Sequence, residues 1–189
     1  MATLNDLAEA AAALRPPLCL KAQSRTIVHK SEAGAVALGL EDQAAVVRSA
    51  EAMAGRLGDA VEGFLVEETA PPGVEMIAGV VTDPDLGWLV LVGTGGIHAE
   101  LLRDVTLRPG PIGRDDAAAM IDGLRGASLL RGARGAPPAD QAALEDCLVT
   151  LSDFASAHED AIREVDLNPV IVAPRGQGVC VVDATIVLR

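Results

Sequence analysis

The apolar segments of this chain are all short. The longest are about the length of a β-strand, far below the roughly 20 residues of a membrane-spanning helix. They alternate with Gly- and Pro-containing turn signals and with segments whose apolar residues recur at helical spacing. Strand candidates are residues 18–23, 35–40, 63–70, 74–81, 88–92, 164–172 and 179–188, and helix candidates are residues 6–14, 42–57, 115–124 and 140–157. This mixture predicts an α+β fold.

One position stands out as a domain boundary. Gly58 ends a predicted helix that begins after Asp42. We place the boundary between residues 62 and 63, which gives a small N-terminal lobe, 1–62, and a larger C-terminal lobe, 63–189. The first three strand candidates of the larger lobe are expected to form an antiparallel meander.

Both lysines of the chain lie in one short segment. Of the 15 basic residues, two are lysines, Lys21 and Lys30, and arginine serves everywhere else. Lys21 follows a short apolar run, and the polar loop after it carries His29, Ser31 and Gly34. A compact, flexible ammonium group suits an anion, so we interpret this loop as a grip for nucleotide phosphates. The alternative is that an Arg-biased composition left two lysines in one exposed loop by chance.

The composition excludes several classes of partner. The net charge is −12 and there is no basic tract, so binding to a nucleic-acid backbone is not expected. Aromatic residues make up 2% of the chain, which removes base-stacking platforms. The three cysteines are far apart and are interpreted as buried small hydrophobes, not as disulfides or zinc ligands. With no signal peptide or membrane span in view, we expect a soluble, cytoplasmic protein that holds an anionic ligand by local positive groups, backbone N–H groups or a metal ion.

The C-terminal hairpin carries a second group of informative residues. If its turn centres between residues 175 and 176, cross-strand partners have numbers that sum to 351, and Asn168 faces Asp183. Asp166 lies two residues from Asn168, on the same face of its strand. Two carboxylates and an amide suit Mg²⁺, and without a cation one carboxylate should have a raised pKa. The alternative is a solvated face of an edge hairpin, and Pro169 indicates an edge or a bulge here.

Two further features are weak when taken alone. Glu67 and Glu68, followed by a rigid Pro-Pro-Gly corner and Glu75, could present backbone groups to an adenine edge and a carboxylate to ribose hydroxyls. The segment 93–96 could let the backbone approach a ligand closely, although it lacks the context of a dinucleotide site or a P-loop. Acidic residues beside a turn are also common without any ligand.

The histidines allow different interpretations. His29 could accept a phosphoryl group, because neutral imidazole is a nucleophile at pH 7. It could equally donate a hydrogen bond to phosphate or be a plain loop residue. His98 could face the same site, whereas His158 ends a helix and is treated as structural.

Ordered motifs from residue 18 to residue 189 point to one family. They are Leu20-Lys21, His29-Lys30-Ser31-Glu32-Ala33-Gly34, Val66-Glu67-Glu68, Pro71-Pro72-Gly73-Val74-Glu75, Asp83-Pro84 with Gly87, Gly95-Gly96-Ile97, Glu100-Leu101-Leu102-Arg103-Asp104-Val105, the Arg- and Gly-rich segment 130–138, and Glu164-Val165-Asp166-Leu167-Asn168-Pro169 with Asp183. Together they resemble the ATP-grasp domain of nucleoside-diphosphate-forming acyl-CoA synthetases, such as the β subunit of acetyl-CoA synthetase (ADP-forming) and, more distantly, of succinyl-CoA synthetase.

The resemblance implies an ATP-grasp fold of two α+β lobes with the nucleotide site between them. It implies that Lys21 reaches the nucleotide phosphates and that His29 relays a phosphoryl group. The implied nucleotide-binding residues are Lys21, Lys30, Ser31, Gly34, Glu67, Glu68, Glu75, Gly95 and Gly96, and the implied Mg²⁺ ligands are Asn168 and Asp183, with Asp166 beside them. The implied cofactors are Mg²⁺ and ATP or ADP, and the implied reaction is acyl-CoA + ADP + phosphate ⇌ carboxylate + CoA + ATP. Catalysis would proceed by positioning and charge neutralisation.

The chain also departs from the family pattern. Gly34-Ala35 stands where the family usually has Gly-Gly, Arg25 replaces a usual proline, and His98 replaces a usual apolar residue. The segment that precedes the first helix in the family is expected to be shortened. A CoA-binding unit and the primary phospho-histidine are expected on a separate α-type subunit, so we expect an oligomer. A nucleotide-sensing or scaffold module, and an ATP-grasp ligase with another acceptor, remain the alternatives.

Overall fold

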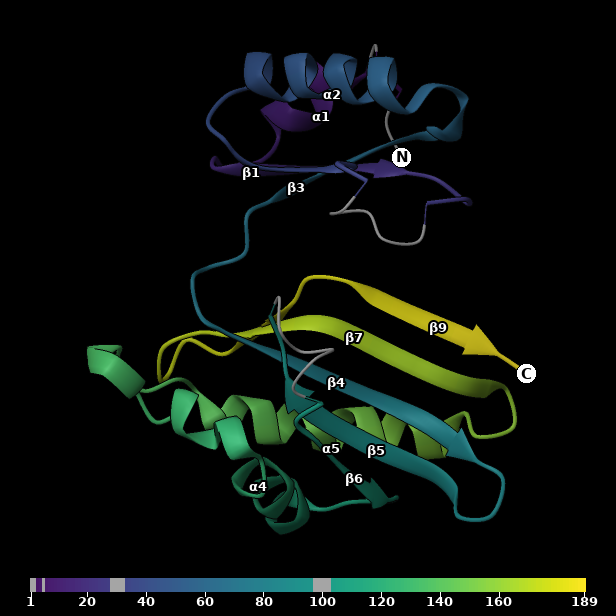
Figure 1. Ribbon diagram of the computed structural model, residues 1–189, viewed down its shortest axis with the longest axis vertical. Coiled ribbons are helices and arrows are strands. Elements are labelled where there is room, and N and C mark those ends of the chain that lie inside the picture. Colours follow the sequence, from purple (N-terminus) through teal and green to yellow (C-terminus); the bar gives the residue numbers. More distant parts are fainter. Residues whose placement is uncertain (1–2, 5, 28–32, 97–102) are drawn as a thin grey trace. The chain divides into compact units, whose positions relative to one another are not determined.

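The computed structural model describes all residues except 1–2, 5, 28–32 and 97–102. The chain forms two compact units, Met1–Thr69 and Ala70–Arg189 (Figure 1). Three predicted residues of the phosphate loop, His29, Lys30 and Ser31, lie outside the described residues, and so does His98.

The first unit is a three-stranded antiparallel sheet with two helices on one face. The strand order is β2-β1-β3, with β1 at Leu18–Gln23, β2 at Val36–Leu40 and β3 at Gly63–Glu68. The helices are α1, Leu7–Ala12, and α2, Gln43–Leu57, and a short 3-10 turn, η1, follows at Gly58–Ala60. Asp42 caps α2 as predicted, because its Oδ1 accepts a hydrogen bond from Ala45 N at 2.6 Å.

The core of the first unit lies between this sheet and its helices. Alternate residues of β1 (Leu18, Leu20 and Ala22) are buried with Phe64 of β3 against Val46, Ala50 and Met53 of α2 and Leu7 and Ala11 of α1. Because side chains of a strand alternate between faces, Cys19 and Lys21 lie on the opposite, helix-free face of this sheet.

The division between the units falls later than the boundary expected from the sequence. β3 pairs with β1 over its whole length, from Leu18↔Glu68 to Gln23↔Gly63. Phe64 and Val66 pack into the first core. A boundary between residues 62 and 63 would remove β3 from this sheet, so the units divide after Thr69. For the same reason the expected meander is wrong in its first strand, whereas its other two strands pair as predicted.

The second unit is a six-stranded antiparallel sheet. Its order is β6-β5-β4-β7-β8, and β9 also pairs with β7. The strands are β4 Val74–Asp83, β5 Gly87–Thr94, β6 Val105–Pro109, β7 Ile162–Val172, β8 Val179–Val181 and β9 Ala184–Leu188. The helices are α4 Arg114–Asp122 and α5 Gln141–Ala157, with 3-10 turns η2 Arg125–Leu129 and η3 Ala133–Gly135. Figure 1 shows α4 and α5 on one face of the sheet; we call the other the helix-free face of the second unit.

The aliphatic composition is reflected in the second core. Val80, Val90, Val92 and Val170 from the sheet are buried against α4 and α5. On β7, Val165 and Leu167 face this core ahead of Pro169, and the residues that alternate with them, Glu164, Asp166 and Asn168, face the helix-free side. One strand therefore supports the core with one set of side chains and displays polar groups with the other.

The register of the C-terminal strands is the one predicted. Val170 pairs with Val181, and Asp166 pairs with Thr185, so partners sum to 351 on both sides of the gap between β8 and β9. β7 is an interior strand and not an edge, because β4 pairs with its other side. The register with β4 shifts between Met76 and Ala78, opposite Pro169, so the proline marks the predicted bulge.

All three cysteines are free; Cys19 is buried as expected, whereas Cys147 and Cys180 are only partly buried. Within the described ranges, no helix combines the length and the apolar character needed to cross a membrane.

Candidate functional site

The helix-free face of the first unit carries an ion pair between two predicted site residues. Lys21 Nζ lies 2.8 Å from Glu67 Oε2. The two residues come from neighbouring strands, because Cys19 pairs with Glu67 and Lys21 with Leu65. The Lys21 side chain is 10% exposed and that of Glu67 is 37% exposed, so the ammonium is largely desolvated while the carboxylate stays in contact with solvent.

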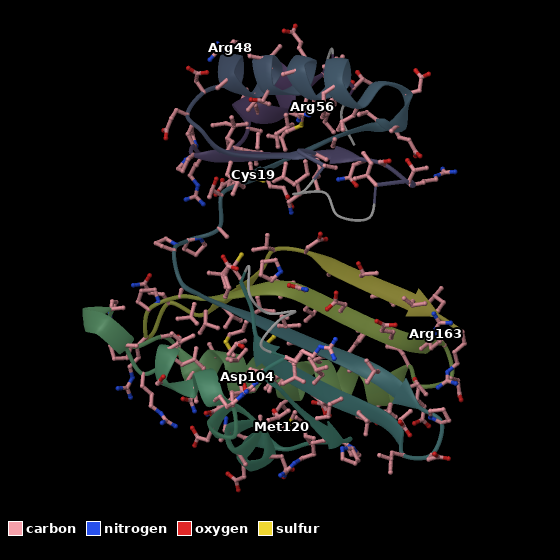
Figure 2. The ribbon with its side chains drawn as sticks, in the orientation of Figure 1. Cys19, Arg48, Arg56, Asp104, Met120 and Arg163 are labelled. Atoms are coloured by element: carbon pink, nitrogen blue, oxygen red, sulfur yellow. The ribbon has the colours of Figure 1, made fainter. Side chains whose placement is uncertain are left out.

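Cys19, labelled in Figure 2, is the cross-strand partner of Glu67 and shares a face of β1 with Lys21. Burial raises the pKa of the Cys19 thiol; the Lys21 charge opposes the rise and the Glu67 charge adds to it. The thiol is therefore neutral at physiological pH, which matches the predicted role of a small buried hydrophobe.

Glu68 does not join Lys21 and Glu67. As the next residue of β3 it points to the opposite face of the sheet, where it binds Arg15. Arg15 Nε and N each donate to Glu68 Oε1 at 3.1 Å, and Nη2 donates to Oε2 at 3.0 Å. These bonds lower the pKa of Glu68. The side chain of Glu68 therefore ties the end of β3 to the segment before β1.

Arg56, which the sequence did not single out, contacts the end of the predicted phosphate loop. Its Nη2 donates a hydrogen bond to the carbonyl oxygen of Gly34. Gly34 has φ +66°, and a Cβ there would lie 2.8 Å from Arg56 Nη2. The positive φ favours glycine, whereas the close contact is with the end of a long side chain that can shift; Figure 2 shows Arg56 on α2.

In the second unit, the structure brings Glu75, Gly95 and Gly96 together. Gly95 N donates to the carbonyl oxygen of Glu75 at 2.9 Å, and a Cβ on Gly95 would lie 2.9 Å from the Glu75 carbonyl carbon. A Cβ on Gly96, whose φ is +91°, would lie 3.7 Å from Glu75 Oε2. The glycines thus let the end of β5 fold tightly over the start of β4.

Asp104 fixes the base of this glycine segment and was missed as a site residue. It is 8% exposed. Its Oδ1 accepts from Arg125 N at 2.9 Å and its Oδ2 from Gly126 N at 2.8 Å, while its carbonyl oxygen accepts from Thr94 N at 3.0 Å. Burial raises the pKa of Asp104, but the backbone N–H groups of Gly126 and Arg125 and the Arg125 charge outweigh it, so the pKa is lowered.

The predicted cation-binding residues share the helix-free face of the second unit. Asn168 N donates to the carbonyl oxygen of Asp183 at 3.1 Å, which fixes these two residues opposite each other. The pKa of Asp166 is raised, first by burial and then by the charges of Glu164 and Asp183. The predicted repulsion between Asp166 and Asp183 is therefore present.

These residues fit a hard divalent cation. Carboxylate and amide oxygens are its preferred ligands, and a bound cation would offset the repulsion that raises the pKa of Asp166. Among the described residues, no group of three or more His, Cys, Asp and Glu side chains could hold a metal ion by itself. Two carboxylates and an amide are the kind of donors that Mg²⁺ takes, because it is often held by few protein ligands together with water and phosphate oxygens.

Comparison with known proteins identifies the family of the chain. A family model described as an ATP-grasp domain matches residues 1–188. The chain therefore belongs to the ATP-grasp domain family.

Its relatives include acyl-CoA synthetases and their β subunits. The chain is 38% identical over 192 residues to the β subunit of acetate–CoA ligase [ADP-forming] II of Pyrococcus furiosus, covering 99% of this chain and 81% of that subunit. It is 40% identical over 196 residues to a trans-feruloyl-CoA synthase of an unknown prokaryotic organism, covering all of this chain and 27% of that protein. The chain thus spans most of a separate β subunit and about a quarter of the longer synthase.

A solved structure gives the same result. The acetyl-coenzyme A synthetase 1 of Ca. Korarchaeum cryptofilum matches with a TM-score of 0.86 and 36% identity. That structure holds coenzyme A and Mg-AMPPCP, and its phosphohistidine segment points towards the nucleotide binding site. The match covers 98% of this chain and 83% of that one. The predicted ATP-grasp fold is confirmed.

Proposed function

We propose that this chain is the nucleotide-binding subunit of an ADP-forming acyl-CoA synthetase. It transfers a phosphoryl group between a phospho-histidine and Mg-ADP, as part of acyl-CoA + ADP + phosphate ⇌ carboxylate + CoA + ATP. The phosphorus–nitrogen bond of the phospho-histidine breaks as the terminal oxygen of ADP forms its bond to phosphorus. The observation that carries the proposal is the oxygen-rich face of β7, where Asn168 lies opposite Asp183 and Asp166 lies two residues away on the same face.

The residues of each unit have separate roles in this proposal. Lys21 binds the phosphates, and Glu67 holds its ammonium in place until the nucleotide arrives. Asn168, Asp183 and Asp166 would hold Mg²⁺, which when bound would neutralise charge on the transferring phosphoryl group. Glu75, Gly95 and Gly96 form a compact backbone turn for the ribose side of the nucleotide.

Three loop residues complete the proposal from the family resemblance. His29 is the residue that relays the phosphoryl group, and Lys30 and Ser31 donate to phosphate oxygens. The CoA-binding domain and the primary phospho-histidine belong to a separate α-type partner. The β-subunit name of the Pyrococcus relative supports this division.

Calorimetric titration with Mg-ADP tests the nucleotide site. Lys21→Ala and Asp183→Ala should each weaken binding by ~1–3 kcal/mol, the loss expected for a charge-assisted contact. Arg48→Ala and Asp153→Ala remove the same charges from exposed positions on α2 and α5 and should leave binding unchanged. Equal affinity of the wild type, Lys21→Ala and Asp183→Ala would contradict the assignment.

Phosphoryl transfer tests the catalytic role. His29→Ala should bind Mg-ADP normally but fail to form labelled ATP from a ³²P-phosphorylated α-type subunit. Transfer that survives the substitution excludes a covalent role for His29. Binding by the wild-type chain without any exchange would favour the alternative, a nucleotide-sensing or scaffold module with the same fold.

A further inference from the structure

The edge of the second sheet is formed by an uncharged, partly exposed strand. β9 pairs with β7 on one side only and is the outermost strand beside it in Figure 1. Its five residues, Ala184–Leu188, contain no charge and no proline. Ile186 is 50% exposed and Leu188 is 66% exposed. Proteins normally protect edge strands with charges, prolines or bulges, so an unprotected edge indicates a surface that another strand covers.

The hydrogen-bonding direction of β9 follows from its pairing with β7. Asn168 N donates to the carbonyl oxygen of Asp183, so residue 183 directs its backbone towards β7. Backbone groups alternate along an antiparallel strand, so residues 185 and 187 also face β7. The backbone groups of Ala184, Ile186 and Leu188 therefore face outward. These are also the residues whose apolar side chains share one face of the strand.

We propose that β9 pairs with β9 of a second copy of this chain, antiparallel and about a two-fold axis through Ile186. Partners in this register have numbers that sum to 372, so Ile186 faces its own symmetry mate and Ala184 faces Leu188 of the partner copy. The outward backbone groups of Ile186 and Leu188 and the carbonyl oxygen of Ala184 are then paired across the interface, and Ala184 N, which donates to Asp183 Oδ1 at 3.0 Å in the single chain, would exchange that bond for one to the partner copy. The two sheets become one continuous sheet across an isologous interface.

Charge complementarity favours a second copy over another occupant. The chain carries a net charge of −12, so two copies can approach closely only where no like charges meet. The self-paired register meets this condition along β9. At each end it also places Asp183 opposite Arg189 of the partner copy, two charges of opposite sign. The strand is thus complementary to itself both in apolar residues and in flanking charge.

Light scattering coupled to size-exclusion chromatography tests the proposal. The wild-type chain should elute at about twice its mass of 19.4 kDa. Ile186→Lys places two ammonium groups opposite each other at the axis and should give the single-chain mass. Leu86→Lys is the matched control, because Leu86 is 64% exposed in the turn between β4 and β5, and β7 lies between β4 and β9 in the sheet; it should remain a dimer. Circular dichroism melts check that both variants are folded.

Cysteine cross-linking tests the register independently of folding stability. Residues in a hydrogen-bonded antiparallel pair have Cα atoms about 5.5 Å apart, within the range of a disulfide. Ile186→Cys should therefore form a covalent dimer under mild oxidation. Leu188→Cys alone should not, but a mixture of Ala184→Cys and Leu188→Cys chains should. The wild type under the same oxidant accounts for the three native cysteines.

Three results would overturn the proposal. They are a wild type that is monomeric at all concentrations, an Ile186→Lys variant that remains dimeric, and an Ile186→Cys variant that cross-links no faster than Leu188→Cys. If the wild type is monomeric and Ile186→Lys instead loses capture by a CoA-binding α-type subunit, the edge serves that partner and the second-copy interface is wrong.

Discussion

Asp166 and Asp104 are two aspartates of the second unit whose environments shift their pKa values in opposite directions. Burial and the nearby charges of Glu164 and Asp183 raise the pKa of Asp166. Asp104 is also buried, but backbone donors and Arg125 lower its pKa. Ionised Asp166 therefore destabilises the folded state, whereas ionised Asp104 stabilises it. A carboxylate that weakens the fold is expected where a cation is bound.

The raised pKa of Asp166 gives a pH-dependent prediction. Its folded pKa exceeds the unfolded value of about 3.9, so ionisation costs stability above that value and costs nothing below it. Asp166→Asn should raise the melting temperature at pH 7, and the gain should shrink as the pH falls towards 4. Thermal melts from pH 4 to 8 measure this, with Asp153→Asn as the control. A gain that is constant over this range would contradict the assigned cause.

The Lys21–Glu67 pair predicts unequal effects of its two neutralising substitutions. Glu67→Gln leaves a charged ammonium in a largely buried position and should cost about 1–3 kcal/mol. Lys21→Met replaces the ammonium by an apolar chain of similar length and leaves Glu67 in contact with solvent, so it should cost less. Urea denaturation of both variants and the double variant measures the difference. A larger loss in Lys21→Met would show that the lysine does more for the fold than its pairing with Glu67 explains.

At the scale of elements, the local parts of the fold could be predicted and the distant pairings could not. The N-cap Asp42 and the periodicity of α2 and α5 are local signals, and they predicted these helices within one or two residues. The turn of the C-terminal hairpin fixed its register for the same reason. The partner of β3 is β1, which lies far away in the chain, and nothing within β3 identifies it.

The same limit applies to the candidate site. Asn168 and Asp183 could be paired from the sequence because one hairpin joins them. The contact between Lys21 and Glu67 depends on the pairing of β1 with β3, so it could not be predicted from the sequence. Asp104 accepts from the start of η2, a contact between two loops that no periodicity marks. The phosphate loop with His29 remains a prediction.

Asp104 joins two elements, the end of β5 and the start of η2, so its substitution should affect both stability and the glycine segment. Asp104→Asn sets an amide group against backbone donors and should cost about 1–3 kcal/mol at pH 7. Because the folded pKa is lowered, this stabilisation is present above the unfolded value and is lost as the pH falls through the folded pKa. Thermal melts carried below the unfolded value of about 3.9 should therefore show a loss that shrinks towards acid. A loss that persists unchanged at the most acidic pH would mean that the carboxylate charge is not involved.

At the scale of the whole molecule, the charge of the chain opposes its proposed ligand. A net charge of −12 repels ADP, while the local positive groups are few. Salt screens the long-range repulsion, with a Debye length of about 10 Å at 0.1 M. The association rate of Mg-free ADP should therefore rise between 25 and 250 mM salt, by about 2-fold or more. Stopped-flow fluorescence with a labelled ADP measures it, and a rate that falls with salt would mean that a local positive field dominates the encounter.

β7 links the chemistry of the chain to its architecture, because Glu164, Asp166 and Asn168 alternate with the core residues Val165 and Leu167. Removing a single residue from this stretch would exchange the two sets on one side of the deletion, putting polar groups against α5 and apolar ones in water. The spacing of the metal-ligand candidates can therefore not be adjusted without also rebuilding the hydrophobic interior. Evolution can change which residue stands at each position of this strand far more easily than it can change how many positions the strand has.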